Sequence, residues 1–198
     1  MTSFRIFEHK KGIYFYPEYF IMLGLILSIF ILGYLETFHD IRLRLLISVL
    51  AVFSLLFVIS MAIWNQFRYQ KLYGDFKGEL IFSKTSIIIN ERSFLLEEIG
   101  KLEFLRFEDY YGNYLYGTSR FAPMRSNGTE NELLIYLKNG EKIRCSFQQS
   151  ESQALKKARA VLTHYHLNGL ISWLHLLDLL QIEDYDEIQH FKRSIHQL

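Results

Sequence analysis

The residues best suited to recognition chemistry lie in one aromatic segment of the sequence, EDYYGNYLYGTSRFAPMRSNGTE, which covers residues 108–130. Aromatic rings give a rigid contact area, and the planar fork of arginine pairs with phosphate or carboxylate groups. We therefore expect the segment to bind a protein partner or a ligand through Tyr110, Tyr114, Tyr116, Arg120, Phe121 and Arg125. Two other interpretations stay open: a sheet rim that packs on the C-terminal helices, or a loop that lies against lipid headgroups.

The remaining reactive residue types do not form a catalytic pattern. His164 and His166 are two positions apart on a predicted helix, so their side chains point to different sides and do not share a metal ion. The single cysteine, Cys145, alternates inward on a predicted strand, which is typical of a core residue. The sequence also lacks a glycine-rich phosphate loop. It therefore predicts a protein without catalytic residues, metal ion or cofactor, and hence not an enzyme.

Two long uncharged segments, Tyr19–Leu35 and Leu45–Trp64, dominate the first third of the sequence. As helices they would extend about 26 and 30 Å, which matches a bilayer core of about 30 Å. A buried helix of a soluble protein usually keeps a polar stripe, and these segments have none. We therefore expect a transmembrane hairpin over residues 19–64, embedded in the lipid bilayer.

The basic residues near the two segments predict the orientation of the hairpin. Lys and Arg flank it on both outer sides, while the connecting loop holds only Arg42 and Arg44. Because cytoplasmic flanks carry the excess of Lys and Arg, both termini are expected in the cytoplasm. The sequence thus predicts a multi-pass protein of the cell inner membrane, with interface anchors at Tyr16, Tyr19, Tyr34 and Trp64.

Small residues in both predicted spans allow close helix packing. They are Gly24 and Ser28 in the first span and Ser48 and Ala51 in the second. Small side chains let helix backbones approach closely in a bilayer. Their spacing leaves open whether the helices pack on each other within one chain or on another copy in a homo-oligomer.

The rest of the chain is predicted to comprise an N-terminal cytoplasmic segment, a stalk, a strand-rich domain and a helical extension, at residues 1–18, 65–77, 78–166 and 167–198. β-Branched and aromatic runs predict strands at GELIF, TSIIIN, SFLL, KLEFLRF, YYGNYLY, ELLIYL and KIRCSF. The last two are expected to join through a type I′ turn at Asn139–Gly140. Ser150 and Gln153 have the spacing of a capping box before an amphipathic helix that ends at Asn168–Gly169.

A membrane hairpin followed by GELIFSKTSIIIN, LLEEIGKLEF, ELLIYLKNGEKIRCSF and SESQALKKARAVLTHY resembles the bacterial PH-like membrane proteins of the YcxB-like group. The likeness runs from Ile13 to Tyr165 and rests on the order of the elements. It implies an α+β cytoplasmic domain, a PH-like seven-stranded barrel closed by a C-terminal helix. It implies no catalysis and supplies no active-site residues. The aromatic insertion at Asp109–Asn131 and the short helices after Gly169 depart from the family's pattern.

Together these features predict a non-enzymatic accessory or scaffold protein of the inner membrane, whose PH-like domain binds a protein partner or a second copy. The alternative is a membrane effector of an antiphage defence system, gated by a cyclic nucleotide. The chain is similar in outline to effectors that join a two-span hairpin to a cytoplasmic β-barrel. A nucleic acid polymer is not expected as a partner, because the net charge of the chain is only +1.

Overall fold

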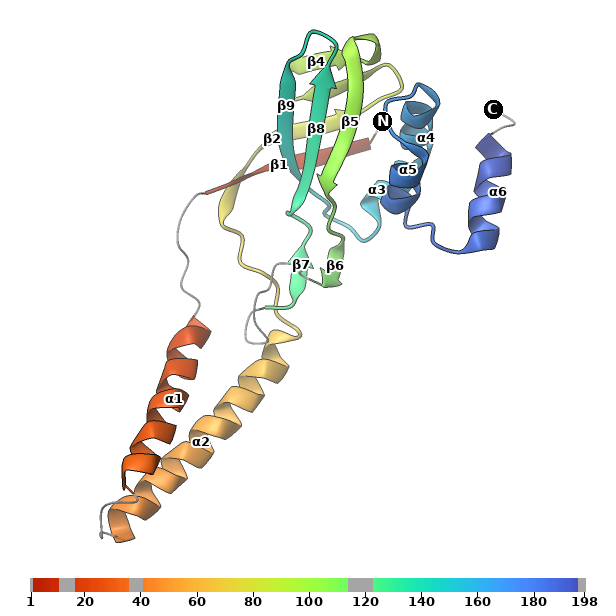
Figure 1. Ribbon diagram of the computed structural model, residues 1–198. Helices are drawn as coiled ribbons and strands as arrows, with labels where there is room; N and C mark the ends of the chain where they lie inside the picture. The colour runs from red at the N-terminus through yellow and green to blue at the C-terminus, as the bar shows by residue number, and fades with distance from the viewer. Residues whose placement is uncertain (1, 11–16, 36–40, 114–122, 196–198) are drawn as a thin grey trace. The chain divides into compact units, whose positions relative to one another are not determined.

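The computed structural model describes residues 2–10, 17–35, 41–113 and 123–195 (Figure 1). The chain divides into two compact units. The first, which we call the sheet unit, joins Met1–Lys10 to Leu72–Asn113 and Ser126–Leu198. The second, which we call the helix-pair unit, joins Lys11–Lys71 to Tyr114–Arg125.

The helix-pair unit consists of α1 (Pro17–Leu35) and α2 (Ile41–Asn65), which pack against each other. Half-buried side chains recur every three or four residues along α2, at Ile47, Ala51, Ser54 and Val58. This spacing places them on one helix face, which is turned toward α1. Most of the remaining described side chains of both helices are apolar and exposed.

One span in the described residues, Leu45–Asn65 of α2, is long and apolar enough to cross a membrane, and none of its apolar 18-residue window is buried. The corresponding run that the structure describes in α1, Met22–Ile31, is shorter. Length and composition of a single helix are weak grounds for a membrane protein.

The sheet unit is built on a seven-stranded sheet whose neighbouring strands are antiparallel. The strands are β1 (Thr2–His9), β2 (Gly74–Phe82), β3 (Ser86–Ile89), β4 (Arg92–Leu95), β5 (Ile99–Arg106), β8 (Asn131–Leu137) and β9 (Lys142–Gln148). Their order across the sheet is β4-β3-β2-β1-β9-β8-β5. The α+β class and the number of strands agree with the expectation from the sequence.

The sheet is open, and the expected closed barrel is wrong. A barrel requires its two outermost strands to pair, whereas β4 and β5 form opposite edges of the sheet. The two strands follow each other in the chain through the short 3₁₀ helix η1 (Leu96–Glu98). This connection carries the chain from one edge of the sheet to the other without pairing the edges (Figure 1).

The N-terminal strand β1 lies in the middle of the sheet, between β2 and β9. It pairs with β2 from Thr2↔Phe82 to His9↔Gly74, and with β9 at Arg5↔Gln148 and Ile6↔Phe147. The sequence interpretation placed residues 1–18 in a separate segment and a complete sheet domain in residues 78–166. The structure differs, because that window lacks one of the central strands.

The predicted strand YYGNYLY contributes instead to a second, two-stranded sheet. Its described part forms β6 (Tyr110–Asn113), which pairs with β7 (Arg125–Asn127). Six of the seven expected strands therefore enter the main sheet, and β1 is the seventh.

Four helices follow the sheet: α3 (Ala154–Lys157), α4 (Arg159–Leu167), α5 (Trp173–Leu180) and α6 (Tyr185–Ile195). The predicted apolar stripe of α3 and α4 is buried, from Ala154 to Tyr165. Tyr165 packs edge-on against Phe82 of β2, with ring centroids 6.2 Å apart, and its hydroxyl donates to Ser83 O at 2.7 Å. Burying a side chain of this size stabilises the fold by about 1.5–3 kcal/mol.

Two local predictions in this unit are wrong in detail. At Asn139–Gly140 only Gly140 has a positive φ (+91°), and its N–H donates to Leu137 O at 3.0 Å. The connection is therefore a type I turn followed by a glycine bulge, rather than a type I′ turn. Ser150 does not cap α3; the N-cap residue is Gln153, with a left-handed backbone (φ +57°) and no capping side-chain bond.

The C-terminal helices also cover the β5 edge of the sheet. The backbone N–H of Leu102 donates to Leu170 O at 2.9 Å, and that of Phe104 donates to His175 Nε2 at 3.0 Å. An uncovered sheet edge is a template for pairing with other chains. The extension after Gly169, which resembled no family element, thus completes the sheet unit.

Candidate functional site

The aromatic segment predicted to bind a partner is only partly within the described residues. Tyr110 and Arg125 are described, whereas Tyr114, Tyr116, Arg120 and Phe121 lie outside the described residues. The structure therefore describes the candidate site only at the two ends of the segment.

Arg125 is attached to the residues that directly follow α2. Its backbone N–H donates to Arg68 O at 3.0 Å, and its backbone O accepts from Gln70 N–H at 2.8 Å. Its guanidinium lies over the Phe67 ring at 5.6 Å and donates through Nε to Gln66 O at 3.4 Å. Arg125 is thus half-buried, and both its backbone N–H and its backbone O are hydrogen-bonded.

Tyr110 and Tyr111 form the other end of the segment. Their ring centroids are 4.4 Å apart in an edge-on arrangement, and Tyr111 is 57% exposed. Tyr111 also has a positive φ (+67°), which a bulky side chain rarely adopts. An exposed aromatic residue held in an unfavourable backbone conformation is a reason to suspect a binding role.

Asp109 and a buried polar cluster hold the ends of the segment in place. Asp109 accepts from Ser152 Oγ at 2.9 Å and from Gln153 N at 2.7 Å. Asn131 Oδ1 accepts from Glu108 N at 2.7 Å and from Gln149 Nε2 at 3.0 Å.

Gln149 connects this cluster to the helices, because its Oε1 accepts from Leu155 N at 3.1 Å in the first turn of α3. The buried amides Asn131 and Gln149 were not predicted as positioning residues. Their polar side chains at the ends of predicted strands could have indicated such a role. Strand periodicity, however, does not reveal which groups they hydrogen-bond.

The residues predicted for helix packing divide into two pairs. Ser28 and Ala51 are half-buried in the helix-pair unit, and Ser28 Oγ donates within its own helix to Leu25 O at 2.8 Å. Gly24 and Ser48 are exposed, and a Cβ added at Gly24 would contact no atom within 4 Å. The close approach that glycine would permit is therefore not used between α1 and α2.

The predicted interface anchors are exposed where the structure describes them. The exposed fractions are 41% for Tyr19, 70% for Tyr34 and 64% for Trp64. Tyr16 lies outside the described residues. Exposed aromatic rings at the ends of apolar helices suit a membrane interface, where one end of the ring is apolar and the other is hydrated.

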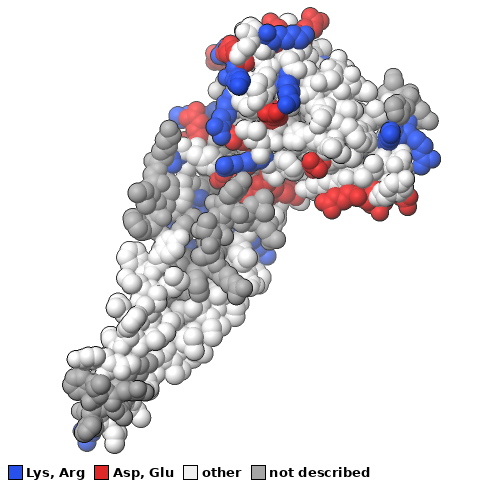
Figure 2. Space-filling model, viewed as in Figure 1, with Lys and Arg blue, Asp and Glu red and all other residues white. Residues whose placement is uncertain are grey.

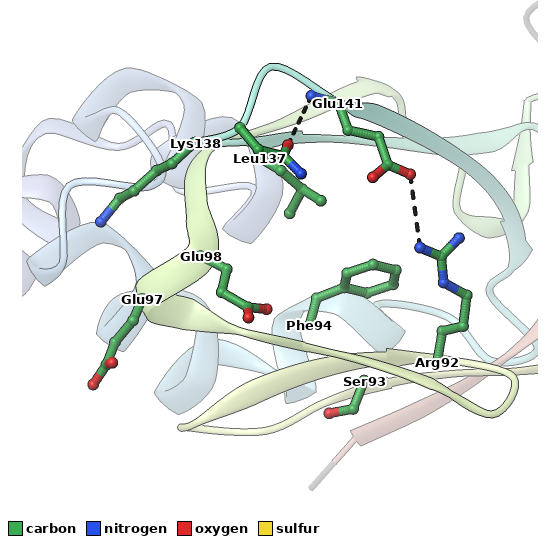
Figure 3. A pocket seen from close by; sticks show the side chains of 9 residues that line it. Arg92, Ser93, Phe94, Glu97, Glu98, Leu137, Lys138 and Glu141 are labelled. Atoms are coloured by element: carbon green, nitrogen blue, oxygen red, sulfur yellow. Dashed lines mark hydrogen bonds and ion pairs between the residues drawn. The ribbon is translucent and has the colours of Figure 1, made fainter.

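A hollow of about 530 Å³ opens beside the β4 edge (Figure 3). Phe94 and Glu98 face this hollow in Figure 3, and Arg92 pairs with Glu141 across 3.7 Å. Three glutamates stand against Arg92 and Lys138 in its lining. Glu98 also accepts from Leu95 N at 3.3 Å, so the β4 edge is partly occupied by its own chain. The mixed charges favour no ligand class.

The residues considered for catalysis have ordinary structural roles in the described part of the chain. Burial raises the pKa of the Cys145 thiol to about 12, so the nucleophilic thiolate is scarce at neutral pH. His166 Nδ1 is 2.8 Å from Ile171 O, and His164 Nε2 is 3.2 Å from Asn168 Nδ2. No three His, Cys, Asp or Glu side chains of the described ranges are grouped to hold a metal ion.

No protein-family model, no curated protein and no solved structure matches this chain.

Proposed function

We propose that the protein is a non-enzymatic integral membrane accessory or scaffold protein, whose sheet unit binds a protein partner or a second copy at the membrane surface. The observation that carries this proposal is the exposed apolar surface of α1 and α2. Phe20, Phe30 and Phe53 are 67%, 73% and 67% exposed. Leaving a phenylalanine in water forgoes about 1.5–3 kcal/mol, and a lipid bilayer removes that cost.

The pairing of β1 with β2 supports a hairpin topology. β1 precedes α1 and β2 follows α2, yet the two strands are adjacent in one sheet from Thr2↔Phe82 to His9↔Gly74. Residues that hydrogen-bond along two strands must lie on the same side of a membrane. The chain between them therefore crosses an even number of times, which fits two spans. The excess of Lys and Arg outside the hairpin favours the cytoplasm for that side, in an inner membrane.

Partner binding is supported by the aromatic ends of segment 108–130. Tyr111 offers an exposed ring on a fixed backbone, and Arg125 offers a guanidinium whose position is set by the residues after α2. Rigid aromatic and arginine side chains carry much of the binding energy in protein interfaces. The resemblance to the YcxB-like proteins agrees with this role. It stays a prediction, because the open sheet differs from the closed barrel that the resemblance implies.

A ligand-gated membrane effector, of the cyclic-nucleotide type, is the second candidate function. The observation that favours it is a basic groove in the sheet unit, between α4 and α6.

Two measurements on the full-length protein test the leading proposal. Alkaline carbonate extraction should leave the protein in the membrane pellet, and its release into the supernatant would contradict integral insertion. A photo-reactive residue at Tyr111 should then form adducts with one defined protein or with a second copy, identified by mass spectrometry. The matched control is the same residue at Tyr185, which is 72% exposed on α6. Equal adducts at both positions, or none at Tyr111, would contradict a docking role for the segment.

A further inference from the structure

A groove of about 720 Å³ lies between α4 and α6 in the sheet unit. Four basic residues line it, Lys84 from the β2–β3 turn, Lys157 from α3, and Arg159 and His164 from α4. Thr163 and Ser194 add hydroxyl groups, and the described lining contains no carboxylate. The groove therefore combines positive charge from three different elements of the fold.

Arg159 is held in a fixed position within this groove. Its guanidinium lies 4.2 Å from the centroid of the Phe191 ring. That ring is only 2% exposed and stacks on Trp173 with centroids 5.5 Å apart. An arginine stacked on a buried ring keeps its planar donors oriented, so less conformational entropy is lost when they bind an anion.

The positive charge of the groove is only partly compensated by the protein. Lys157 forms an ion pair with Glu151, which lies outside the lining. Lys84 and Arg159 form no ion pair with any residue in the described ranges. The acidic residues of α6 are in its first turn, while Lys192 and Arg193 are in its last turn. Figure 2 shows the same separation along this helix.

We propose that this groove binds a phosphate-bearing ligand, with Arg159, Lys84 and Lys157 contacting the phosphate oxygens. Several oxygens with delocalised negative charge suit cations that converge from several directions, and arginine pairs with phosphate through two parallel hydrogen bonds. Such a phosphate can belong to a soluble molecule or to a lipid headgroup. This site is separate from the aromatic segment and does not depend on membrane insertion, and it would supply the ligand site that the second candidate function requires.

Trp173 offers a built-in reporter for binding, because it stacks on the ring that Arg159 covers. The chain has two tryptophans, so a Trp64→Phe background isolates the signal of Trp173. Full-length protein in micelles of a non-ionic detergent is titrated with pyrophosphate in one arm. In the other arm the micelles are doped with phosphatidylglycerol, and phosphatidylcholine serves as the neutral comparison.

The proposal expects a saturable change in Trp173 emission in at least one arm, and the responding arm identifies a soluble phosphate or a lipid headgroup as the source. The double variant Lys84→Gln/Lys157→Gln should weaken that binding about ten-fold, and added salt should weaken it further. The control variant Lys77→Gln/Lys101→Gln removes the same charge from exposed positions elsewhere on the sheet. Equal weakening by both double variants, or no saturable change in either arm, would overturn the proposal.

Discussion

The position of β1 in the middle of the sheet predicts a large effect of a single substitution before the helix pair. Phe4 on β1 is 5% exposed, and its ring lies edge-on to Phe82 at 5.6 Å and to Phe147 at 5.2 Å. Replacing a core phenylalanine with alanine removes its buried surface and leaves a cavity, at a cost of about 3–5 kcal/mol. Phe4→Ala should therefore lower the free energy of unfolding of the sheet unit by about that amount.

Urea unfolding in non-ionic detergent measures this effect, with Trp173 fluorescence followed in the Trp64→Phe background. Ser3→Ala is the matched control, because Ser3 is an exposed neighbour on the same strand and should change stability by less than about 0.5 kcal/mol. A cost below about 1 kcal/mol for Phe4→Ala would refute the placement of β1 in the core.

Three further predictions concern buried or half-buried groups of the sheet unit. Because burial raises the pKa of Cys145 to about 12, a maleimide at pH 8 should label the folded chain more than about 100-fold slower than the urea-unfolded chain; equal rates would be contrary to this burial. Burial lowers the pKa of His175, and the charge of Lys101 lowers it further. The carboxylates of Asp178 and Glu103 raise this pKa, but burial outweighs them. Since the unfolded chain then binds the proton more readily, stability should fall as pH drops below about 6.5, and His175→Gln should flatten this slope in pH-dependent urea unfolding. Tyr165→Phe, which leaves Ser83 O without its donor, should destabilise the sheet unit by about 1–3 kcal/mol in the same assay, and a neutral result would count against that bond.

Patterns within a few residues predicted most of the elements correctly. The alternation of Ile143, Cys145 and Phe147 with polar residues predicted β9, and all three residues lie in that strand. Asn139–Gly140 identified the hairpin, although the turn type differed. Glycine takes the positive φ in both alternatives, so the dipeptide predicts a reversal better than it predicts its geometry.

Long-range pairing was the part that local patterns did not determine. Phe4 and Ile6 alternate with Ser3 and Arg5, which is a strand signal, but strands usually pair with near neighbours in sequence. The partners of β1 are separated from it by the helix pair and by most of the chain. Local patterns also did not determine whether the sheet closes into a barrel. Which strands form its edges depends on how the chain passes across the sheet, and no single segment of the sequence encodes that path.

The candidate binding residues illustrate a second limit of sequence reasoning. Arg125 was predicted only as a binding residue of the aromatic segment, yet it also contacts residues 66–70, some 55 positions earlier in the chain. Ser150 and Gln153 matched a capping box. In the structure the Gln153 N–H donates to Asp109 instead, and Gln149 accepts the N–H of Leu155 in the first turn of α3. A side chain that forms a tertiary hydrogen bond can replace a local one, and spacing alone does not distinguish the two.

Cysteine accessibility in sealed cells tests the central claim, that α1 and α2 cross a membrane as a hairpin with β1 and β2 on one side. Three introduced cysteines, each in a separate variant, suffice: Ser3→Cys on β1, Glu79→Cys on β2 and Ile41→Cys, at the 78% exposed start of α2. The native Cys145 is 4% exposed and contributes little background. A membrane-impermeant maleimide should label Ile41→Cys in intact cells, and should label Ser3→Cys and Glu79→Cys only after permeabilisation. Labelling of all three alike, or different labelling of Ser3→Cys and Glu79→Cys, would contradict the hairpin.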